Sequence, residues 1–406
     1  MAIRVKVAQT PKELTDVYKL RYQVYVEGEG YFKDMPGNMI SDHFDSIPGC
    51  ANIIAYSGDT PVATMRANLD SEILLPSDEM YDFSEYRQRV AEQAKEGDGR
   101  VLLGSAGMLA IAEPWRNRRD VFRALFKMCC DVGHSWDVTH IISTVNVKTA
   151  AMYKRLRFEE LAEKVWLPEI GEHIIPMGNI FEPIYEWAFG AFADKHDFLE
   201  NFTGCFQYLL VSAGSDIFLQ DQPGDEAYLI SKGMVNISRS DPDSDESLSL
   251  ATLSRGDMFG ELSLIDDQPR SATAKAVSNV ELVVLNREAF WQKAHQDPQY
   301  LKGLLKILTS RLRDIDQRAF VYAHGSVDVR LTFFINKVLE SAVASVKSPG
   351  DFVAKITIEE FAYMASAPQK EAASFLLTLQ LDNHLKLNKK EITFHGNEAI
   401  STTEQQ

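Results

Sequence analysis

Two short runs constrain this chain more than any other feature, residues 259–264 (FGELSL) and residues 269–273 (PRSAT). They place one carboxylate, Glu261, and one guanidinium, Arg270, at a fixed separation in the chain. A carboxylate can accept a hydrogen bond from a ribose hydroxyl, and a guanidinium can pair with a phosphodiester through a fork of donors. The two runs therefore predict a binding site for a cyclic nucleotide.

The small residues around this pair favour the same interpretation. Gly260 allows the backbone to approach a sugar, while Ser271 and Ala272 can offer backbone N–H groups and a hydroxyl to phosphate oxygens. Leu262 completes the set of candidate nucleotide-binding residues. The alternative is an ordinary surface ion pair on a strand–turn–strand, which is what single Glu/Arg pairs usually are.

A glycine-punctuated run upstream, residues 224–235 (GDEAYLISKGMV), looks like the hairpin that precedes such a site. Together these segments resemble the cyclic-nucleotide-binding domains of protein kinase A regulatory subunits and of bacterial catabolite-activator-type regulators. The resemblance implies a β-roll over residues 195–297 with a cyclic nucleotide as its effector. Ser271 follows the bacterial pattern of a small hydroxyl residue after the arginine, which favours cAMP over cGMP.

Residues 1–190 alternate helical and strand patterns, which predicts a mixed sheet with helices on both faces. The expected elements are helices over 11–25, 120–134 and 149–156, a strand–turn–strand over 51–66, and strands over 101–112 and 141–145. The polar stretch 71–100 is expected to be a mobile insertion over this domain.

A basic loop, with Arg116, Arg118 and Arg119, lies between an expected strand and an expected helix. Such a loop offers cations and free N–H groups to an anion, usually a phosphate, and the alternative is a solvated basic turn. Downstream, Asn146, Ala150, Tyr153 and Phe158 give the spacing N-x3-A-x2-Y-x4-F. This spacing resembles the coenzyme A side of the GCN5-related N-acetyltransferase fold. The resemblance implies that the basic loop and Asn146 hold acyl-CoA and that Tyr153 acts as general acid near the thioester sulfur.

The first sixty-six residues narrow this resemblance. Arg21, Tyr25, Asp42, Asp45 and Arg66 look like the R-x3-aromatic, D-x2-D and arginine positions of acyl-homoserine-lactone synthases and bacterial N-acyl amino acid synthases. Those enzymes take acyl chains from coenzyme A or acyl carrier protein. The expected catalytic set is Tyr153, Asp42, Asp45 and Arg66, with the two aspartates holding the substrate ammonium. Backbone N–H groups around residues 109–111 would stabilise the oxyanion.

The chain differs from these family patterns at several motif positions. Arg119 and Val121 replace the usual glycines of the pyrophosphate loop, and Arg157 stands where a glycine is usual after the tyrosine. The glutamate and arginine of the lactone-synthase central strand are replaced near Ser105 and Met108. These departures argue against a lactone product and leave an acyl-CoA sensor as an alternative to an enzyme.

Residues 298–324 form a heptad pattern that predicts a dimerisation helix. Its apolar residues alternate in steps of four and three, at Leu301, Leu305, Leu308, Leu312, Ile315, Ala319 and Tyr322. A parallel homodimer is expected, and the alternative is a helix packed against its own domain.

Residues 325–400 resemble the winged helix-turn-helix of catabolite-activator-type regulators, with residues 368–381 as the recognition helix. The family's R-E-x-x-x-R pattern is replaced by QKEAAS at 369–374, and residues 325–406 carry eight Lys/Arg against ten Asp/Glu. A net charge of −2 is unfavourable for duplex DNA, whose binding depends on neutralising several phosphates. We therefore expect a degenerate module, with DNA as the less favoured partner and a protein-interaction or structural remnant as the alternative.

The sequence as a whole describes an α+β multi-domain protein of 406 residues with a net charge of −16. It has no run of eighteen apolar residues and no secretory leader, and Cys50, Cys129, Cys130 and Cys205 lack metal or disulfide spacing. A cytoplasmic protein without membrane contact or metal is expected. The favoured function is an acyltransferase controlled by a cyclic nucleotide, transferring an acyl group to an amine. The alternative is a cAMP-responsive transcriptional regulator with an appended acyl-sensing domain.

Overall fold

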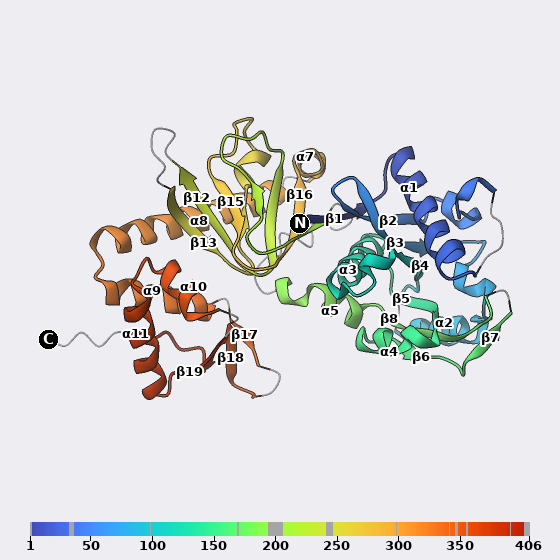
Figure 1. Ribbon diagram of the computed structural model, residues 1–406. Coiled ribbons are helices and arrows are strands. Elements are labelled where there is room, and N and C mark those ends of the chain that lie inside the picture. The colour runs from blue at the N-terminus through green and yellow to red at the C-terminus, as the bar shows by residue number, and fades with distance from the viewer. Residues whose placement is uncertain are drawn as a thin grey trace.

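The computed structural model describes three units that lie in a row along the molecule (Figure 1). The described residues are 2–31, 36–97, 99–168, 170–193, 206–240, 247–297, 299–340, 342–345, 348–354, 356–389 and 391–401. We call residues 2–193 the N-terminal unit, 206–297 the middle unit and 299–401 the C-terminal unit, each with those gaps. The expected domain limit at residue 195 falls outside the described residues.

The N-terminal unit is a mixed α/β unit, as the alternation of patterns predicts. Its strands are β1 (Ala2–Val7), β2 (Cys50–Ser57), β3 (Thr60–Leu69), β4 (Leu103–Ile111), β5 (His140–Asn146), β6 (Glu159–Glu160), β7 (Val165–Leu167) and β8 (Glu172–Ile180). Its helices are α1 (Pro11–Tyr22), the π-helical turn η1 (Gln23–Gly28), α2 (Ser84–Gly97), α3 (Arg119–Ser135), α4 (Val147–Arg155) and α5 (Glu182–Ala193), with short 3-10 turns η2 (Pro36–Asn38), η3 (His43–Ser46), η4 (Pro76–Glu79) and η5 (Glu113–Trp115). All seven elements expected from the sequence, three helices and four strands, are present within a few residues of their predicted ends.

A bulge shapes the centre of this sheet. β4 and β5 form a parallel pair over three residues only, from Leu103 opposite His140 to Ser105 opposite Ile142. Beyond that point β4 carries an extra residue relative to β3, and Met108 takes a positive φ of 49°. A bulge re-aims a strand and ends its pairing. The backbone of β4 from Met108 onward is therefore not paired with β5.

The polar stretch 71–100 is not the loose insertion that the sequence led us to expect. It contains η4 and α2, whose apolar side chains form a small core with the sheet. Leu75 and Phe83 are almost completely buried there, and Arg87 pairs with Asp70 and Asp78. The prediction failed because the few apolar residues of this stretch are spaced among many charged ones, although they are enough to anchor one helix.

The middle unit is a β-roll of two facing sheets. Its strands are β9 (Gln207–Val211), β10 (Asp216–Phe218), β11 (Glu226–Lys232), β12 (Val235–Ser240), β13 (Ser247–Leu253), β14 (Met258–Phe259), β15 (Thr273–Ala276) and β16 (Val280–Asn286). The 3-10 turn η6 (Glu261–Leu264) follows β14, and α7 (Arg287–Gln296) follows β16. One sheet has the order β10-β15-β12-β13. The other contains β14, β11, β16 and β9, and Tyr228, Phe259 and Leu282 pack in the core between them.

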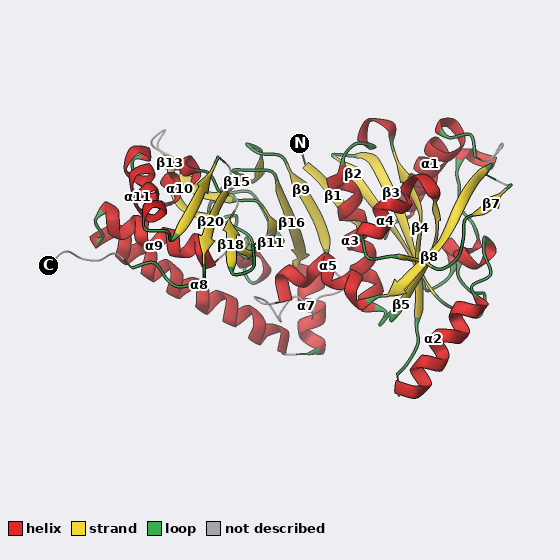
Figure 2. Ribbon diagram, turned by 90° about the horizontal axis from the view of Figure 1, so that it is seen from below, coloured by secondary structure: helices red, strands yellow, loops and turns green. Residues whose placement is uncertain are grey.

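The N-terminal and middle units share a single sheet. β1 pairs antiparallel with β2 along one edge and antiparallel with β9 along the other. The result is a continuous sheet of order β14-β11-β16-β9-β1-β2-β3-β4-β5-β8-β6, which runs through both units (Figure 2). Helix α3 lies against β1, β2, β3 and also β9, so it spans the junction. Nothing in the sequence indicated this pairing.

The C-terminal unit begins with the long helix α8 (Gln299–His324), which leads away from the middle unit (Figure 2). It continues with α9 (Val327–Glu340), β17 (Val343–Ala344), β18 (Asp351–Ala354), α10 (Ile358–Met364), α11 (Gln369–Leu381), β19 (Leu385–Asn388) and β20 (Glu391–His395). The strands form a sheet of order β17-β18-β20-β19, and Phe334, Phe361 and Leu376 lie in the core of this unit. The helix expected over 368–381 is α11.

Among the described residues, no helix is both long and apolar enough to cross a membrane. Cys50, Cys129 and Cys130 are free thiols, while Cys205 lies outside the described residues. Burial raises the pKa of the Cys50 thiol to about 11 and also raises the pKa of the Cys129 and Cys130 thiols. None of these three thiols is therefore ionised at neutral pH.

Candidate functional site

The turn after β14 is built around Gly260, whose φ of 71° lies in the left-handed region. A Cβ at this position would lie 2.8 Å from Nη1 of Arg270 and 3.1 Å from the carbonyl oxygen of Glu226. Both the backbone conformation and the lack of space therefore require glycine here. The turn leads from β14 into η6, which begins at Glu261 and lies beside Arg270.

Arg270 is the centre of this site, and its guanidinium is buried, with 5% of the residue exposed. Its Nη1 donates to the carbonyl oxygens of Glu226 (2.8 Å) and Gly260 (3.2 Å) and to Oγ of Ser263 (2.8 Å). The guanidinium carbon lies 4.2 Å from the ring centre of Phe218. All the side-chain hydrogen bonds described for Arg270 are made by Nη1.

The Nε atom of Arg270 is buried and has no hydrogen-bond partner among the described residues. A buried donor without a partner is costly, and an anion that accepts from it removes that cost. The backbone of Gly224 packs directly against this side chain, because a Cβ there would lie 2.2 Å from Nε, so only glycine fits at position 224. The guanidinium is thus held through Nη1, and its Nε is a remaining donor for a phosphate.

The remaining predicted nucleotide residues differ in their exposure to solvent. Glu261 and Ala272 are buried, whereas Leu262 and Ser271 are exposed on the rim, Leu262 by 47%. The sequence interpretation did not single out Ser263, although its hydroxyl fixes Arg270. A hydroxyl residue inside the FGELSL run was the only available indication of this role.

Two further side chains that sequence reasoning missed fasten η6 to α7. Arg287, at the start of α7, donates to the carbonyl oxygens of Ser263, Gly224 and Asp266. Trp291, one turn later, donates from Nε1 to the carbonyl oxygen of Leu264 (2.7 Å). The segment around the phosphate site and the helix that leads into α8 are therefore connected directly.

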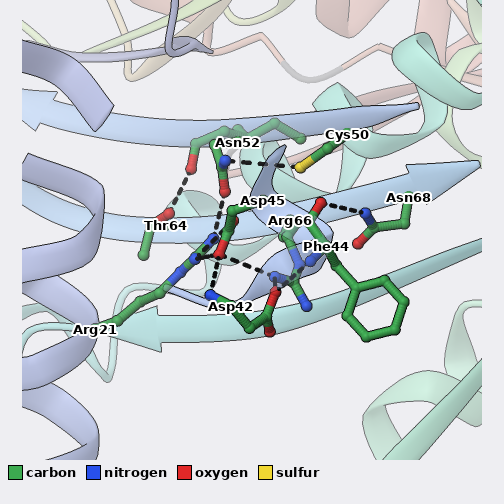
Figure 3. A network of polar contacts seen from close by, with 10 residues as sticks. Arg21, Asp42, Phe44, Asp45, Cys50, Asn52, Thr64, Arg66 and Asn68 are labelled. Atoms are coloured by element: carbon green, nitrogen blue, oxygen red, sulfur yellow. Dashed lines mark hydrogen bonds and ion pairs between the residues drawn. The ribbon is translucent and has the colours of Figure 1, made fainter. Parts of the chain in front are cut away.

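The N-terminal unit holds a second constellation, a network of buried charges (Figure 3). Nη1 of Arg21 donates to both carboxylate oxygens of Asp45 (3.0 Å each), and Nη2 donates to Asn52. Nη1 of Arg66 lies 3.1 Å from Asp45 and 2.6 Å from Asp42. Arg21, Asp45 and Arg66 are almost completely buried. The network ties α1, η3, β2 and β3 together.

Asp42 and Asp45 differ in what they can reach. Asp45 accepts from Arg21 and from the backbone N–H of Asp42, and its side chain is 2% exposed. Burial alone would raise the pKa of Asp45, but Arg21 and Arg66 outweigh burial and hold it below its usual range. The Asp42 side chain is 32% exposed, so it is the member of the pair that a substrate amine can reach. In this geometry Asp45 positions the arginines rather than meeting a substrate.

Tyr153 lies in an aromatic cluster beneath the sheet. Its ring packs edge-on against Phe126 and Phe158, with centroids 6.2 Å and 5.3 Å away. Burial is the main cause that raises the pKa of Tyr153, and the neighbouring Cys129 and Tyr25 add to it. The hydroxyl is therefore protonated at neutral pH and can act only as a proton donor. Tyr25 in turn donates to the carbonyl oxygen of Leu109 (2.9 Å), on the part of β4 that does not pair with β5.

The basic loop occupies the turn between β4 and α3. Arg118 is the N-cap of α3 and pairs with Asp120 (2.7 Å), and Arg116 pairs with Glu29 (2.8 Å). Arg119, the first residue of α3, is exposed. The first turn of a helix carries N–H groups without intrahelical partners. Asn146 caps α4, where its side chain accepts from the backbone N–H of Lys148 (2.9 Å).

Each of these two groups of residues lies in a part of the chain that matches a known family. Residues 16–179 match the family model of the N-acyl amino acid synthase FeeM, and residues 209–297 match that of the cyclic nucleotide-binding domain. The chain carries an N-acyl amino acid synthase domain of the FeeM family followed by a cyclic nucleotide-binding domain. The buried network and Tyr153 belong to the synthase domain, and Arg270 belongs to the nucleotide domain.

Relatives of the second half include regulators of the cAMP receptor type. The CRP-like cAMP-activated global transcriptional regulator of Mycobacterium tuberculosis is 27% identical over 192 residues, which are 46% of this chain and 84% of that protein. The cyclic AMP receptor protein of Thermus thermophilus is 33% identical over 138 residues, 34% of this chain and 63% of its own length. Among solved structures, the catabolite activator protein of Thermus thermophilus is 26% identical, with coverage of 49% and 89% and a TM-score of 0.28.

Proposed function

We propose that this chain is an acyltransferase controlled by a cyclic nucleotide. It transfers an acyl group from acyl-CoA or acyl carrier protein to an amine, on a GCN5-related N-acetyltransferase-like scaffold. The observation that carries the proposal is the continuous sheet, which joins a FeeM-type domain to a nucleotide domain whose Arg270 holds an unused donor. cAMP is the proposed effector, because regulators named for cAMP are related to the second half of the chain.

The proposed chemistry assigns a role to each of these groups of the synthase domain. The amine nitrogen attacks the thioester carbon, the C–S bond breaks and an amide bond forms. Asp42 binds the substrate ammonium, and Asp42 or water takes the amine proton. Backbone N–H groups of β4 near Leu109 stabilise the oxyanion, and the neutral Tyr153 hydroxyl returns a proton to the leaving thiolate. The basic loop, with Arg119 and the first turn of α3, binds the donor's phosphates.

An acyl-transfer assay on the full chain tests this assignment. Purified protein is incubated with long-chain acyl-CoA and a panel of amino acids, with and without cAMP, and thiol release and amide formation are measured. Tyr153→Phe keeps the ring packing against Phe126 and Phe158 and removes only the proton donor. We expect a fall in kcat of about 100-fold or more with an unchanged Kd for acyl-CoA. An undiminished kcat would remove Tyr153 from the mechanism, and no turnover with any acceptor would contradict the enzyme.

Dimerisation through α8 is the second part of the proposal. Three seam residues of that helix, Leu305, Leu312 and Ile315, are at least half exposed in the single chain, while Leu301 and Leu308 pack against the core of their own chain. A row of exposed leucine and isoleucine at heptad spacing is stabilised when a second helix covers it. We therefore propose a parallel homodimer, with α8 of each protomer in the contact.

A second candidate function is transcriptional regulation, favoured by the extent of the match to the Mycobacterium tuberculosis regulator. Under it, residues 325–400 form a winged helix-turn-helix, with α11 as the recognition helix. Retention on duplex DNA that weakens steeply with salt would support this function. Equal retention at all salt concentrations, or none, would leave the C-terminal unit as a structural or protein-binding part of the enzyme.

A further inference from the structure

We infer that nucleotide binding is communicated to the synthase domain through Glu226 and Arg4, across the shared sheet. The inference deepens the proposed function and rests on it, because it identifies the residues that regulate the same acyl-transfer site. It concerns positioning residues, since neither side chain belongs to the proposed catalytic or nucleotide-contacting sets.

The first step is the junction between the domains. Arg4, in the middle of β1, lies opposite Tyr56 of β2 on one side and opposite Leu209 of β9 on the other. Its Nη1 and Nη2 donate to the two carboxylate oxygens of Glu226, at 2.6 Å and 3.0 Å, in a bidentate pair. Nη1 also donates to the side chain of Gln207 (2.9 Å). Arg4 therefore contacts both domains. Its backbone pairs with β2 of the synthase domain, and every side-chain hydrogen bond described for it goes to the nucleotide domain.

The second step is that the same glutamate touches the phosphate site. The carbonyl oxygen of Glu226 accepts from Nη1 of Arg270 (2.8 Å), while its carboxylate accepts from the hydroxyl of Tyr228 (2.8 Å) as well as from Arg4. The guanidinium of Arg270 also lies 5.6 Å from the ring centre of Tyr228. Glu226 thus contacts Arg270, the proposed phosphate-binding residue, through its backbone carbonyl. It contacts Arg4 of the synthase domain through its carboxylate.

The third step is the consequence of binding. A phosphate that pairs with Nε of Arg270 draws the guanidinium toward itself and competes with the carbonyl oxygens that Nη1 now satisfies. A shift of Arg270 acts on the backbone of Glu226 at the start of β11, and the bidentate pair passes that shift to β1. Because β1 is paired with β2 over five residues, from Ile3 to Val7, it cannot move without the synthase sheet.

A second contact keeps the junction stiff. Glu281 of β16 lies between Arg123 and Lys127 of α3 and Lys232 of β11, at 3.3, 3.8 and 3.0 Å. Helix α3 begins at Arg119, in the proposed donor-binding loop. Helix α3, which begins in the proposed acyl-CoA-binding loop, is therefore also paired with the nucleotide domain. The position of β11 and β16 consequently affects the synthase site.

The experiment measures acyl-CoA affinity by calorimetry on the full chain, with and without saturating cAMP, together with hydrogen exchange of the β1 and β2 amides. In the wild type we expect cAMP to change both, with at least a fivefold change in acyl-CoA affinity. Arg4→Gln and Glu226→Gln remove the charge pair but keep the backbone carbonyl that Arg270 uses. We expect both variants to bind cAMP within threefold of the wild type, and the change in acyl-CoA affinity to fall below twofold.

Two control variants separate coupling from general damage. Lys6→Gln lies on the same strand and loses a pair with Glu13 inside the synthase domain, so it should keep the full response. Arg4→Lys retains a charge at the junction and should keep part of the response to cAMP. If Arg4→Gln and Glu226→Gln bind cAMP and respond fully, the route through these residues is overturned while the proposed function stands. If the wild type binds no cAMP, the proposed function fails and the inference fails with it.

Discussion

Gly260 shows how a single backbone position controls the nucleotide site, because its left-handed φ and its contact with Arg270 act at the same place. Gly260→Ala should displace the guanidinium and weaken cAMP binding by at least tenfold. Gly214→Ala is the matched control: its φ is also positive, at 80°, but nothing lies within 4 Å of its added Cβ. Titration calorimetry with cAMP compares the two, and equal losses of affinity would show that backbone strain alone is responsible.

Asp45 has a structural role, because two buried guanidinium groups pair with it. Removing one partner of a buried ion pair leaves uncompensated charge, so Asp45→Asn should lower the free energy of unfolding by about 3 kcal/mol. Asp42→Asn, at a one-third exposed side chain, should cost less than about 1 kcal/mol of stability. Urea unfolding measures both. A loss for Asp42→Asn as large as that for Asp45→Asn would contradict the division of roles.

The same carboxylate predicts a pH dependence of stability. Arg21 and Arg66 hold the pKa of Asp45 below its ordinary value in the folded state. The stability it contributes is therefore fully present above the unfolded pKa of about 4 and is lost as pH falls through the lower folded value. The stability gap between wild type and Asp45→Asn should be constant from pH 5 to pH 8 and should narrow below pH 4. A gap that closed between pH 5 and pH 6 would show that another group is responsible.

At the scale of elements, helix α8 makes the clearest prediction. Leu312 is 60% exposed in the single chain, and Leu312→Glu would place a charge in the proposed dimer contact of both protomers. Loss of two buried leucines, at about 1.5 kcal/mol each, raises the dimer Kd by about a hundredfold. Leu219→Glu, at a leucine that is 43% exposed in the middle unit, is the control. Sedimentation velocity measures the change, and a wild type that sediments as a monomer would contradict the contact.

The elements also show how far the sequence leads. Hydrophobic period predicted α3 and β5 within a few residues, and the resemblance to a winged helix-turn-helix predicted α11. The packing of stretch 71–100 was missed, because three or four scattered apolar residues give no period. The burial of Asp45 was missed too, because a motif gives residue types and not which of two aspartates faces inward.

For the whole molecule, the feature that no local pattern could predict is the sheet shared by two domains. β1 is six residues long and pairs with strands some 50 and 200 positions away, and such pairing depends on tertiary packing rather than on propensity. The arrangement places the nucleotide site and the synthase site on one hydrogen-bonded framework. This framework is the physical basis for expecting that a ligand at one site changes affinity at the other.

Reciprocal calorimetry on the wild-type chain tests this central claim most directly. cAMP is titrated with and without saturating long-chain acyl-CoA, and acyl-CoA with and without saturating cAMP. Coupling free energies are reciprocal, so we expect each ligand to change the affinity of the other by the same factor, between about fivefold and 150-fold. If both ligands bind and neither changes the affinity of the other, the two domains are joined without being coupled, and the account of a nucleotide-controlled acyltransferase is contradicted.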